Sequence, residues 1–190
     1  MAGLFRFRRS RGPVELAVDM AGVRLGERFL QAGVSDPRVF AILARIAGLT
    51  GRACAVVDGP EGARLLEAAA RKEGVLVEII VADGIHWPLD NGAFDVAVVD
   101  GDALLQRDAS ARAPRLGEVM RLVRQGGRVL VIRRSPLGIA ARLGFARQSA
   151  GPSPEASRLL HALEGAGFRP ARLLAEREGM TFVEGFRPSS

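Results

Sequence analysis

A glycine and an aspartate at the ends of two predicted strands are the residues whose types and spacing could do chemistry. One predicted strand, Arg28–Gly33, ends at Gly33, and the next, Ala53–Asp58, ends at Asp58. About two dozen residues separate them, close to the ~20 residues expected between a glycine turn and a ribose-binding carboxylate. A glycine lets the backbone approach an adenosine-type ligand, and the carboxylate accepts hydrogen bonds from ribose hydroxyls. We therefore predict a nucleotide-type site at Gly33 and Asp58.

A second pair of carboxylates, Asp100 and Asp102, follows the apolar strand predicted over Phe94–Val99. Ligands of open α/β sheets bind at the carboxyl ends of the strands, so either aspartate is a candidate catalytic residue that orients or deprotonates a substrate. Hard cations need several oxygen ligands, and Arg133 and Arg134 follow the next strand, so we expect no metal site. The two arginines either contact an anionic substrate or a partner, or are solvated.

Apolar spacing and helix-boundary residues predict an α/β fold with alternating helices and strands. Asp36 is expected to cap a helix that has Pro37 in its first turn. The expected helices are Pro13–Ala21, Pro37–Ala47, Glu61–Glu73, Pro114–Arg124 and Pro154–Glu164. The expected strands are Arg28–Gly33, Ala53–Asp58, Val75–Ala82, Phe94–Val99, Arg128–Ile132, Phe168–Ala175 and Met180–Gly185. A long loop, Ser135–Pro154, is expected to carry a short helix near Ile139–Leu143.

The order of these elements predicts a single Rossmann-like domain with helices on both faces of a seven-stranded, mostly parallel sheet. The C-terminal hairpin must contain an antiparallel strand. We expect that strand, Met180–Gly185, to lie between the fifth strand and the strand at Phe168–Ala175.

Length and composition predict one soluble domain over residues 13–190, preceded by a basic tail over residues 1–12. The tail carries four arginines, Arg6, Arg8, Arg9 and Arg11, and is either disordered or a short arm that touches phosphate or a membrane surface. No apolar run approaches the ~20 residues of a membrane span. The single cysteine, Cys54, fits a reducing cytoplasm.

The formal charge of +6 comes from 27 basic residues, of which only Lys72 is a lysine. Most of the arginines alternate with glutamates on predicted helix faces, which is typical of solvated surfaces. Tyrosine is absent and aromatic residues make up 5% of the sequence, so no platform for stacking bases is evident. We expect that nucleic acid is not the substrate.

Several motifs occur in an order typical of one family. They are Leu25–Leu30 before the first strand, Val57-Asp58, Ala82-Asp83-Gly84, the segment Trp87–Asp95, the helix, double-glycine turn and strand over Arg121–Val131, Gly165–Phe168, and Glu176–Met180. From about Leu25 to Pro188 the sequence resembles the class I S-adenosylmethionine-dependent methyltransferases. It is most similar to the small-molecule type that includes ubiquinone and menaquinone biosynthesis enzymes.

This resemblance implies S-adenosylmethionine as the cofactor and methyl transfer to a small-molecule acceptor as the reaction. The cofactor-binding residues that it implies are Gly33, Ser35, Asp58, Asp83 and Gly84. Two of them have structural alternatives, since Asp58 could cap the following helix and Asp83 could only form a turn. We expect His86 to be a solvated loop histidine rather than a general base.

The first loop departs from the family pattern, which has an acidic residue followed by three alternating glycines. The corresponding residues here are Gln31, Gly33, Ser35 and Pro37. These changes remove a charge, add a side chain beside the ligand and remove an amide donor, which predicts weak or lost cofactor binding. The alternative function is therefore a catalytically silent binding or scaffold module with the same fold. No motif indicates the acceptor, the pathway or the oligomeric state.

Overall fold

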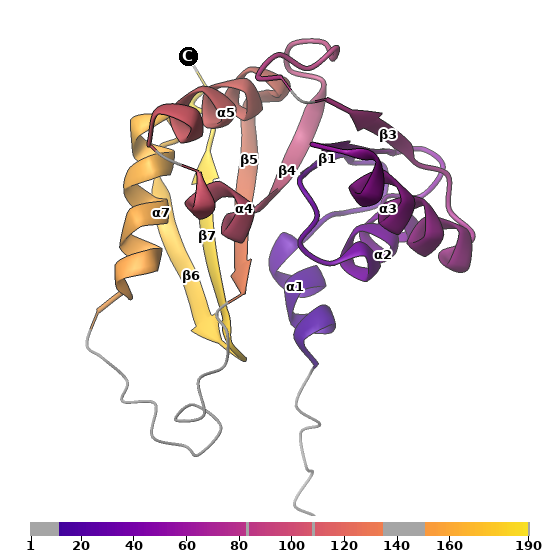
Figure 1. Ribbon diagram of the computed structural model, residues 1–190, viewed down its shortest axis with the longest axis horizontal. Helices are drawn as coiled ribbons and strands as arrows, with labels where there is room; N and C mark the ends of the chain where they lie inside the picture. The colour runs from indigo at the N-terminus through magenta and orange to yellow at the C-terminus, as the bar shows by residue number, and fades with distance from the viewer. Residues whose placement is uncertain (1–11, 83, 108, 135–150, 190) are drawn as a thin grey trace, which may run out of the picture.

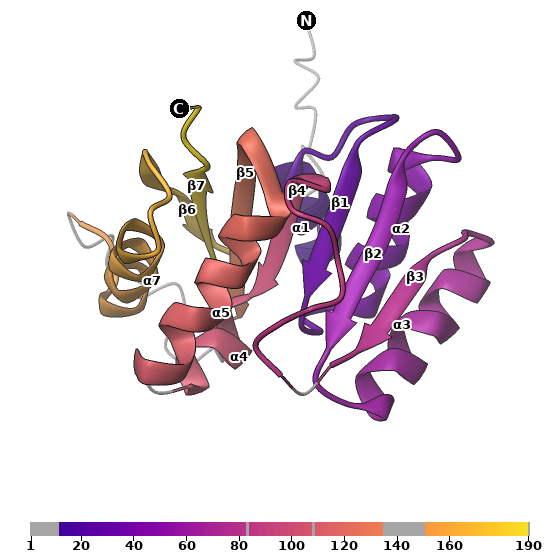
Figure 2. The ribbon, with the colours of Figure 1, turned by 90° about the horizontal axis from the view of Figure 1, so that it is seen from above.

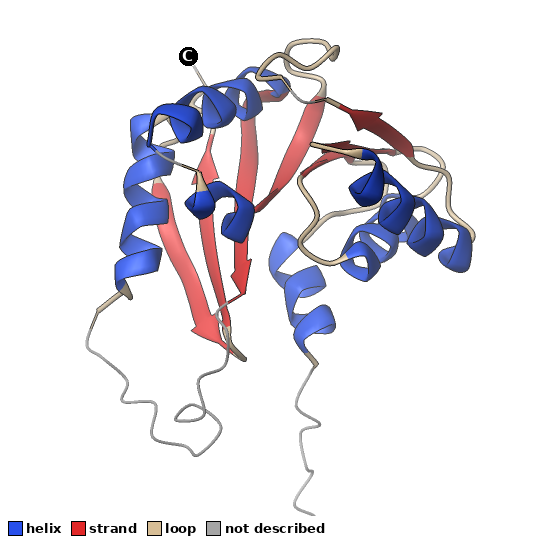
Figure 3. Cartoon of the chain, in the orientation of Figure 1, coloured by secondary structure: helices blue, strands red, loops and turns tan. Residues whose placement is uncertain are grey.

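The computed structural model describes residues 12–82, 84–107, 109–134 and 151–189 of the 190-residue chain. Its helices and strands alternate for most of the length (Figures 1 and 3). The helices are α1 (Pro13–Ala21), α2 (Pro37–Ala47), α3 (Pro60–Glu73), α4 (Gly101–Gln106), α5 (Ala109–Leu122) and α7 (Pro154–Gly165). The strands are β1 (Arg28–Ala32), β2 (Arg52–Val57), β3 (Glu78–Val81), β4 (Phe94–Asp100), β5 (Val123–Arg134), β6 (Ala171–Arg177) and β7 (Met180–Phe186).

The strands form one seven-stranded sheet in the order β3-β2-β1-β4-β5-β7-β6. The first five strands are parallel to one another, and β7 is antiparallel to both β5 and β6. The prediction that the last strand lies antiparallel between the fifth strand and its own hairpin partner is confirmed. The predicted fold class is confirmed as well.

Helices cover both faces of the sheet, with α1, α2 and α3 on one face and α4, α5 and α7 on the other (Figure 2). Alternate residues of β4 enter the two resulting cores. Val96 and Val98 pack with the first set of helices, whereas Ala97 and Val99 pack with the second. Burial on both faces explains why this strand is a continuous apolar run. None of the helices in the described ranges is long and apolar enough to cross a membrane.

Helix α4 was not predicted. It has only six residues, too few for a clear apolar period, and it begins because Asp100 caps it. The Asp100 side chain accepts hydrogen bonds from the backbone N–H groups of Asp102 and Ala103, at 3.0 and 3.1 Å. The helix expected to start at Pro114 instead begins at Ala109 and continues through the proline.

Three strands begin three or more residues away from their expected starts. Strand β3 begins at Glu78 rather than Val75, β6 begins at Ala171 rather than Phe168, and β5 begins at Val123, before the double glycine. Phe168 is instead fully buried in the core, because its ring packs beneath β7 at Gly185. The basic tail through residue 11, and residues 135–150 with their expected short helix, lie outside the described residues.

Candidate functional site

Three of the predicted site residues converge at the carboxyl edge of the sheet. Ala32, at the end of β1, pairs with Val56 of β2 and with Val99 of β4. The residues that follow these positions are Gly33, Asp58 and Asp100, and they line a common cavity. The structure therefore brings these three residues together and surrounds them with side chains that the sequence did not indicate.

Gly33 is required by packing. Its φ of +84° favours glycine, and a Cβ atom at this position would lie 2.9 Å from Cβ of Asp100. Its N–H donates to the carbonyl of Val56 at 2.9 Å, and its carbonyl accepts from the buried amide of Gln31 at 3.2 Å. The first loop is thus held in place by the protein's own contacts.

Asp36 caps helix α2, as predicted, by accepting a hydrogen bond from the backbone N–H of Arg38 at 2.9 Å. Its buried carboxylate also pairs with the guanidinium groups of Arg38 and Arg134, at 3.1 and 2.5 Å. Burial alone would raise the pKa of Asp36, but the hydrogen bonds from Arg38 and Arg134 outweigh it and hold the pKa below its usual value. Ser35, directly before it, is partly exposed.

Asp58 is bound by two arginines that the sequence argument missed. Nη2 of Arg107 lies 2.6 Å from one carboxylate oxygen, and the guanidinium of Arg115 pairs with the other. The alternative role as a helix cap is wrong, because Gly59 is the N-cap of α3 and no side chain caps it. The two arginines lie 49 and 57 residues away in the sequence, so no local pattern could have indicated the contacts.

Arg115 also connects Asp58 to the tryptophan. Its guanidinium carbon lies 5.3 Å from the centroid of the Trp87 ring, a cation–π distance. The Trp87 ring is buried, and its indole N–H has no hydrogen-bond partner among the described residues. Burial lowers the pKa of Arg115, which has a side chain only 13% exposed.

Glu118 on α5 fixes the loop that contains Trp87. The buried Glu118 carboxylate accepts from the backbone N–H of Trp87 at 2.8 Å and from Arg121 at 2.8 and 2.6 Å. The hydrogen bonds from Arg121 lower the pKa of Glu118. His86 is exposed, with its Nδ1 atom 3.5 Å from Glu118, which agrees with a solvated loop histidine.

The candidate catalytic aspartates are both engaged in structural contacts. Asp100 caps α4, and burial raises its pKa despite the two backbone N–H groups that it accepts. Asp102 accepts from the backbone N–H of Arg134 at 2.8 Å and lies 3.4 Å from the Arg133 guanidinium. Among the residues described, no group of three or more His, Cys, Asp or Glu side chains could hold a metal ion.

The cavity between these residues is small, about 20 Å³. Space of that size holds about one water molecule, whereas small-molecule pockets typically measure ~300–1,000 Å³. Arg107 and Arg115 line it together with Gly33, Asp58 and Asp100. The Asp58 side chain is 44% exposed, but each of its oxygens pairs with an arginine, so a ribose would have to compete with Arg107 and Arg115 for it.

The last two predicted cofactor residues follow β3. Gly84 is exposed in that loop, and Asp83 lies outside the described residues. Cys54 is buried in β2, where burial raises the pKa of its thiol to about 12 and makes it inert as a nucleophile.

Solved structures with this fold include S-adenosylmethionine-dependent methyltransferases. One from Aquifex aeolicus aligns with a TM-score of 0.71 and 17% identity, over 92% of this chain and 89% of its own. An S-adenosylmethionine-dependent O-methyltransferase from Thermotoga maritima aligns with a TM-score of 0.65 and 15% identity, over 93% of this chain and 65% of its own. The [4+2]-cyclase SpnF aligns with a TM-score of 0.67 and 17% identity, over 93% of this chain and 80% of its own.

These alignments confirm the resemblance at the level of the fold, which is the one adopted by class I methyltransferases. No family model matches the sequence, and no curated protein matches it. The cyclase shows that proteins named for a different reaction share the architecture, so function has to be argued from the site.

Proposed function

We propose that this protein transfers a methyl group from S-adenosylmethionine to a small-molecule acceptor. The observation that carries the proposal is the position of Asp58, a carboxylate directly after β2 and beside Gly33, in a sheet with the methyltransferase strand order. A carboxylate at this strand end is suited to accept hydrogen bonds from the two hydroxyls of a ribose.

The residues present fit such a cofactor once the arginines are displaced. Asp58 would bind the ribose, Gly33 and Ser35 would line the first loop, and Asp83 and Gly84 would border the adenine. The cofactor would supply an electrophilic methyl group, and the protein would have to align the acceptor with it. Alignment of reacting groups can provide much of the rate, so few catalytic side chains are required.

Asp100 is the better placed of the two candidate catalytic carboxylates. It lines the same cavity as Asp58, whereas Asp102 is held against the backbone of Arg134. Its raised pKa makes the carboxylate a stronger base once ionised, suited to accept a proton from an acceptor hydroxyl or amine. We assign Asp100 the role of orienting or deprotonating the acceptor.

The competing function is a silent module that keeps the fold without binding the cofactor. The specific observation in its favour is the small size of the cavity, in which Arg107 and Arg115 already pair with the carboxylate that a ribose would need. The changes at Gln31, Ser35 and Pro37 point in the same direction. In this case the protein would serve as a binding or scaffold module, with its surface as the contact area for partners.

Calorimetric titration with S-adenosylhomocysteine separates the two functions. We expect binding by the wild type and a loss of about 1.5–3 kcal/mol in Asp58→Ala, the range for a hydrogen bond to a charged group. Glu67→Ala, an exposed carboxylate on α3, is the matched control and should bind like the wild type. No binding at millimolar ligand would favour the silent module, and equal affinity in Asp58→Ala would remove Asp58 from the site.

A further inference from the structure

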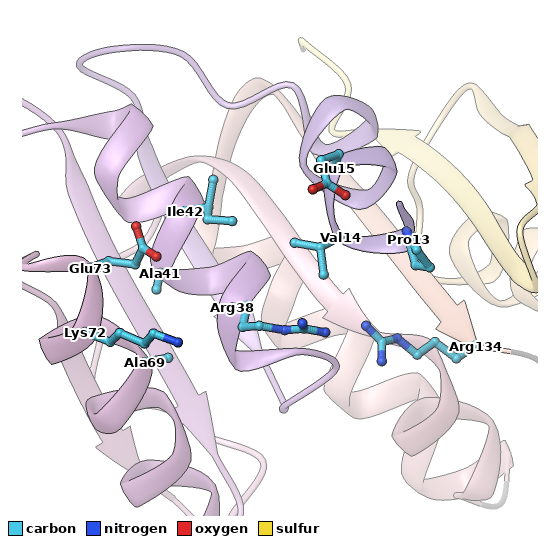
Figure 4. Close-up of a pocket in the computed structure, with 10 residues that line it drawn as sticks. All are labelled: Pro13, Val14, Glu15, Arg38, Ala41, Ile42, Ala69, Lys72, Glu73 and Arg134. Carbon is cyan, nitrogen blue, oxygen red and sulfur yellow. The ribbon is translucent and has the colours of Figure 1, made fainter. Parts of the chain in front are cut away.

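A second and larger cavity lies outside the site described above. It is a groove of about 440 Å³ between α1, α2 and α3, open beside the end of β5 (Figure 4). This volume is within the usual range for small-molecule pockets, ~300–1,000 Å³. The groove is therefore large enough for a ligand that the carboxyl-edge cavity cannot accept.

Two guanidinium groups meet at one end of the groove. Arg38, from the first turn of α2, and Arg134, from the end of β5, point toward each other in Figure 4. Both pair with the same carboxylate, Asp36, which is only 6% exposed and lies beneath them. Since one carboxylate neutralises one guanidinium, this end of the groove keeps a positive charge.

The remaining charges along the groove do not cancel this excess. Lys72 extends from α3 toward Arg38 in Figure 4, and it forms no ion pair with any residue of the described ranges. Glu73 is held by Arg45, with 3.6 Å between the paired atoms. Three cations, Arg38, Lys72 and Arg134, thus face two carboxylates, Asp36 and Glu15, which leaves one positive charge.

The wall of the groove between these charges is apolar. Val14 of α1 and Ile42 of α2 are half-buried and face each other across it. The partly exposed Ala69 adds to this surface, whereas Ala41 is fully buried. Such a surface favours a hydrocarbon chain, because covering it removes apolar area from water. A purely ionic ligand would leave it uncovered.

We propose that this groove binds an amphipathic anion, a short apolar chain that ends in one carboxylate or phosphate. The anionic group would lie between the guanidiniums of Arg38 and Arg134, which have the planar fork that matches such oxyanions. The chain would lie against Val14 and Ile42. This site does not depend on methyl transfer.

Calorimetry with octanoate as the probe tests the site in the full-length protein. We expect octanoate to bind the wild type, and Arg38→Gln to weaken its binding at least tenfold. The Arg38 side chain is 70% exposed, so this variant should fold. Arg64→Gln is the matched control, since Arg64 is 76% exposed on α3 and does not line the groove.

Three further probes and one further variant decide which part of the proposal holds. Octyl phosphate should bind like octanoate, and Ile42→Asp should abolish binding of both. If octanamide bound as tightly as octanoate, the anionic half of the site would be wrong. If acetate bound as tightly, the apolar half would be wrong. No octanoate binding, or equal binding in the wild type and in Arg38→Gln, would overturn the proposal.

Discussion

Arg115 lies over the ring of Trp87, with the guanidinium carbon 5.3 Å from the ring centroid. The same guanidinium pairs with Asp58, so the ribose-type carboxylate and the only tryptophan of the sequence share one cation. A ligand that displaces Arg115 from Asp58 moves a charge relative to the indole. The fluorescence of Trp87 should therefore respond to ligand binding at Asp58.

Ligand binding at Asp58 should change the emission of Trp87. We expect titration with S-adenosylhomocysteine to shift the intrinsic fluorescence with the same dissociation constant that calorimetry gives. In Arg115→Met, which removes the cation from the ring, the starting spectrum should differ and the ligand-induced change should largely disappear. Binding detected by calorimetry without any fluorescence change in the wild type would show that Arg115 stays in place.

Removing Arg107 should have the opposite effect to removing Asp58. Arg107 competes with a ribose for a carboxylate oxygen 2.6 Å away, and its side chain is one-third exposed. We expect Arg107→Ala to tighten S-adenosylhomocysteine binding by about 0.5–1.5 kcal/mol, a value reduced for partial exposure. Arg64→Ala is a control for the loss of a surface charge. Weaker binding in Arg107→Ala would mean that Arg107 contacts the ligand instead.

Ser35→Gly tests whether the altered first loop limits cofactor affinity. The change removes a side chain from the loop that joins Gly33 to the cap at Asp36, while Pro37 and the cap stay in place. We expect tighter S-adenosylmethionine binding, seen as a larger ligand-dependent rise in melting temperature than in the wild type. If the wild type already binds at micromolar affinity and the variant is no better, Ser35 is not an obstacle.

Gly33→Ala and Gly117→Ala should change stability in opposite directions. An alanine at position 33 would require a positive φ and would bring its Cβ atom within 2.9 Å of Asp100, so we expect a loss of about 2 kcal/mol or more. Gly117 is exposed within α5 and has nothing within 4 Å of an added Cβ atom. Alanine there should add about 0.5–1 kcal/mol by helix propensity. Urea unfolding of both variants measures the difference, and a neutral Gly33→Ala would contradict the packing argument.

Glu118→Gln should make the free energy of unfolding depend less on pH under acid conditions. The pKa of Glu118 is lower in the folded protein than its usual value of 4.5, so the unfolded chain binds the proton more readily. Glu118 contributes its full share of the free energy of unfolding above pH 4.5. This contribution is lost as the pH falls through the folded-state pKa. We expect the variant to be about 1–3 kcal/mol less stable at pH 7 and to lose less stability than the wild type below pH 4.5.

Urea midpoints at a series of pH values measure this effect. Glu67→Gln, which changes an exposed carboxylate, is the control and should follow the wild type. The pKa values of Asp36 and Asp95 are lowered too, because hydrogen bonds from arginines outweigh their burial, so some slope should remain in every variant. Parallel profiles for the wild type and Glu118→Gln would show that Glu118 contributes nothing to the pH dependence.

Most of the sheet could be predicted from the sequence, because apolar runs mark strands buried on both faces and the terminal hairpin forces an antiparallel strand. The cap at Asp36 was predictable for a similar reason, since a cap is a contact between near neighbours in sequence. Helix α4 was not, because its one local signal is the capping residue Asp100, and a carboxylate at a strand end equally indicates a ligand site. The pairing of Asp58 with Arg107 and Arg115 depends on where the end of α4 and helix α5 lie, and contacts between distant residues leave no local pattern.

The position of β7 has a consequence for how the protein is made. Within the described part of the chain, strand β6 pairs only with β7, and β5 has β7 as its neighbour on that side. While the ribosome is still synthesising Met180–Phe186, β6 has no strand to join and β5 is an open edge. Unpaired strand edges are prone to aggregation in partly folded chains. The seven-stranded sheet is complete only after Phe186 has left the ribosome. Until then, the nascent chain exposes the edge of β5 and leaves β6 unpaired.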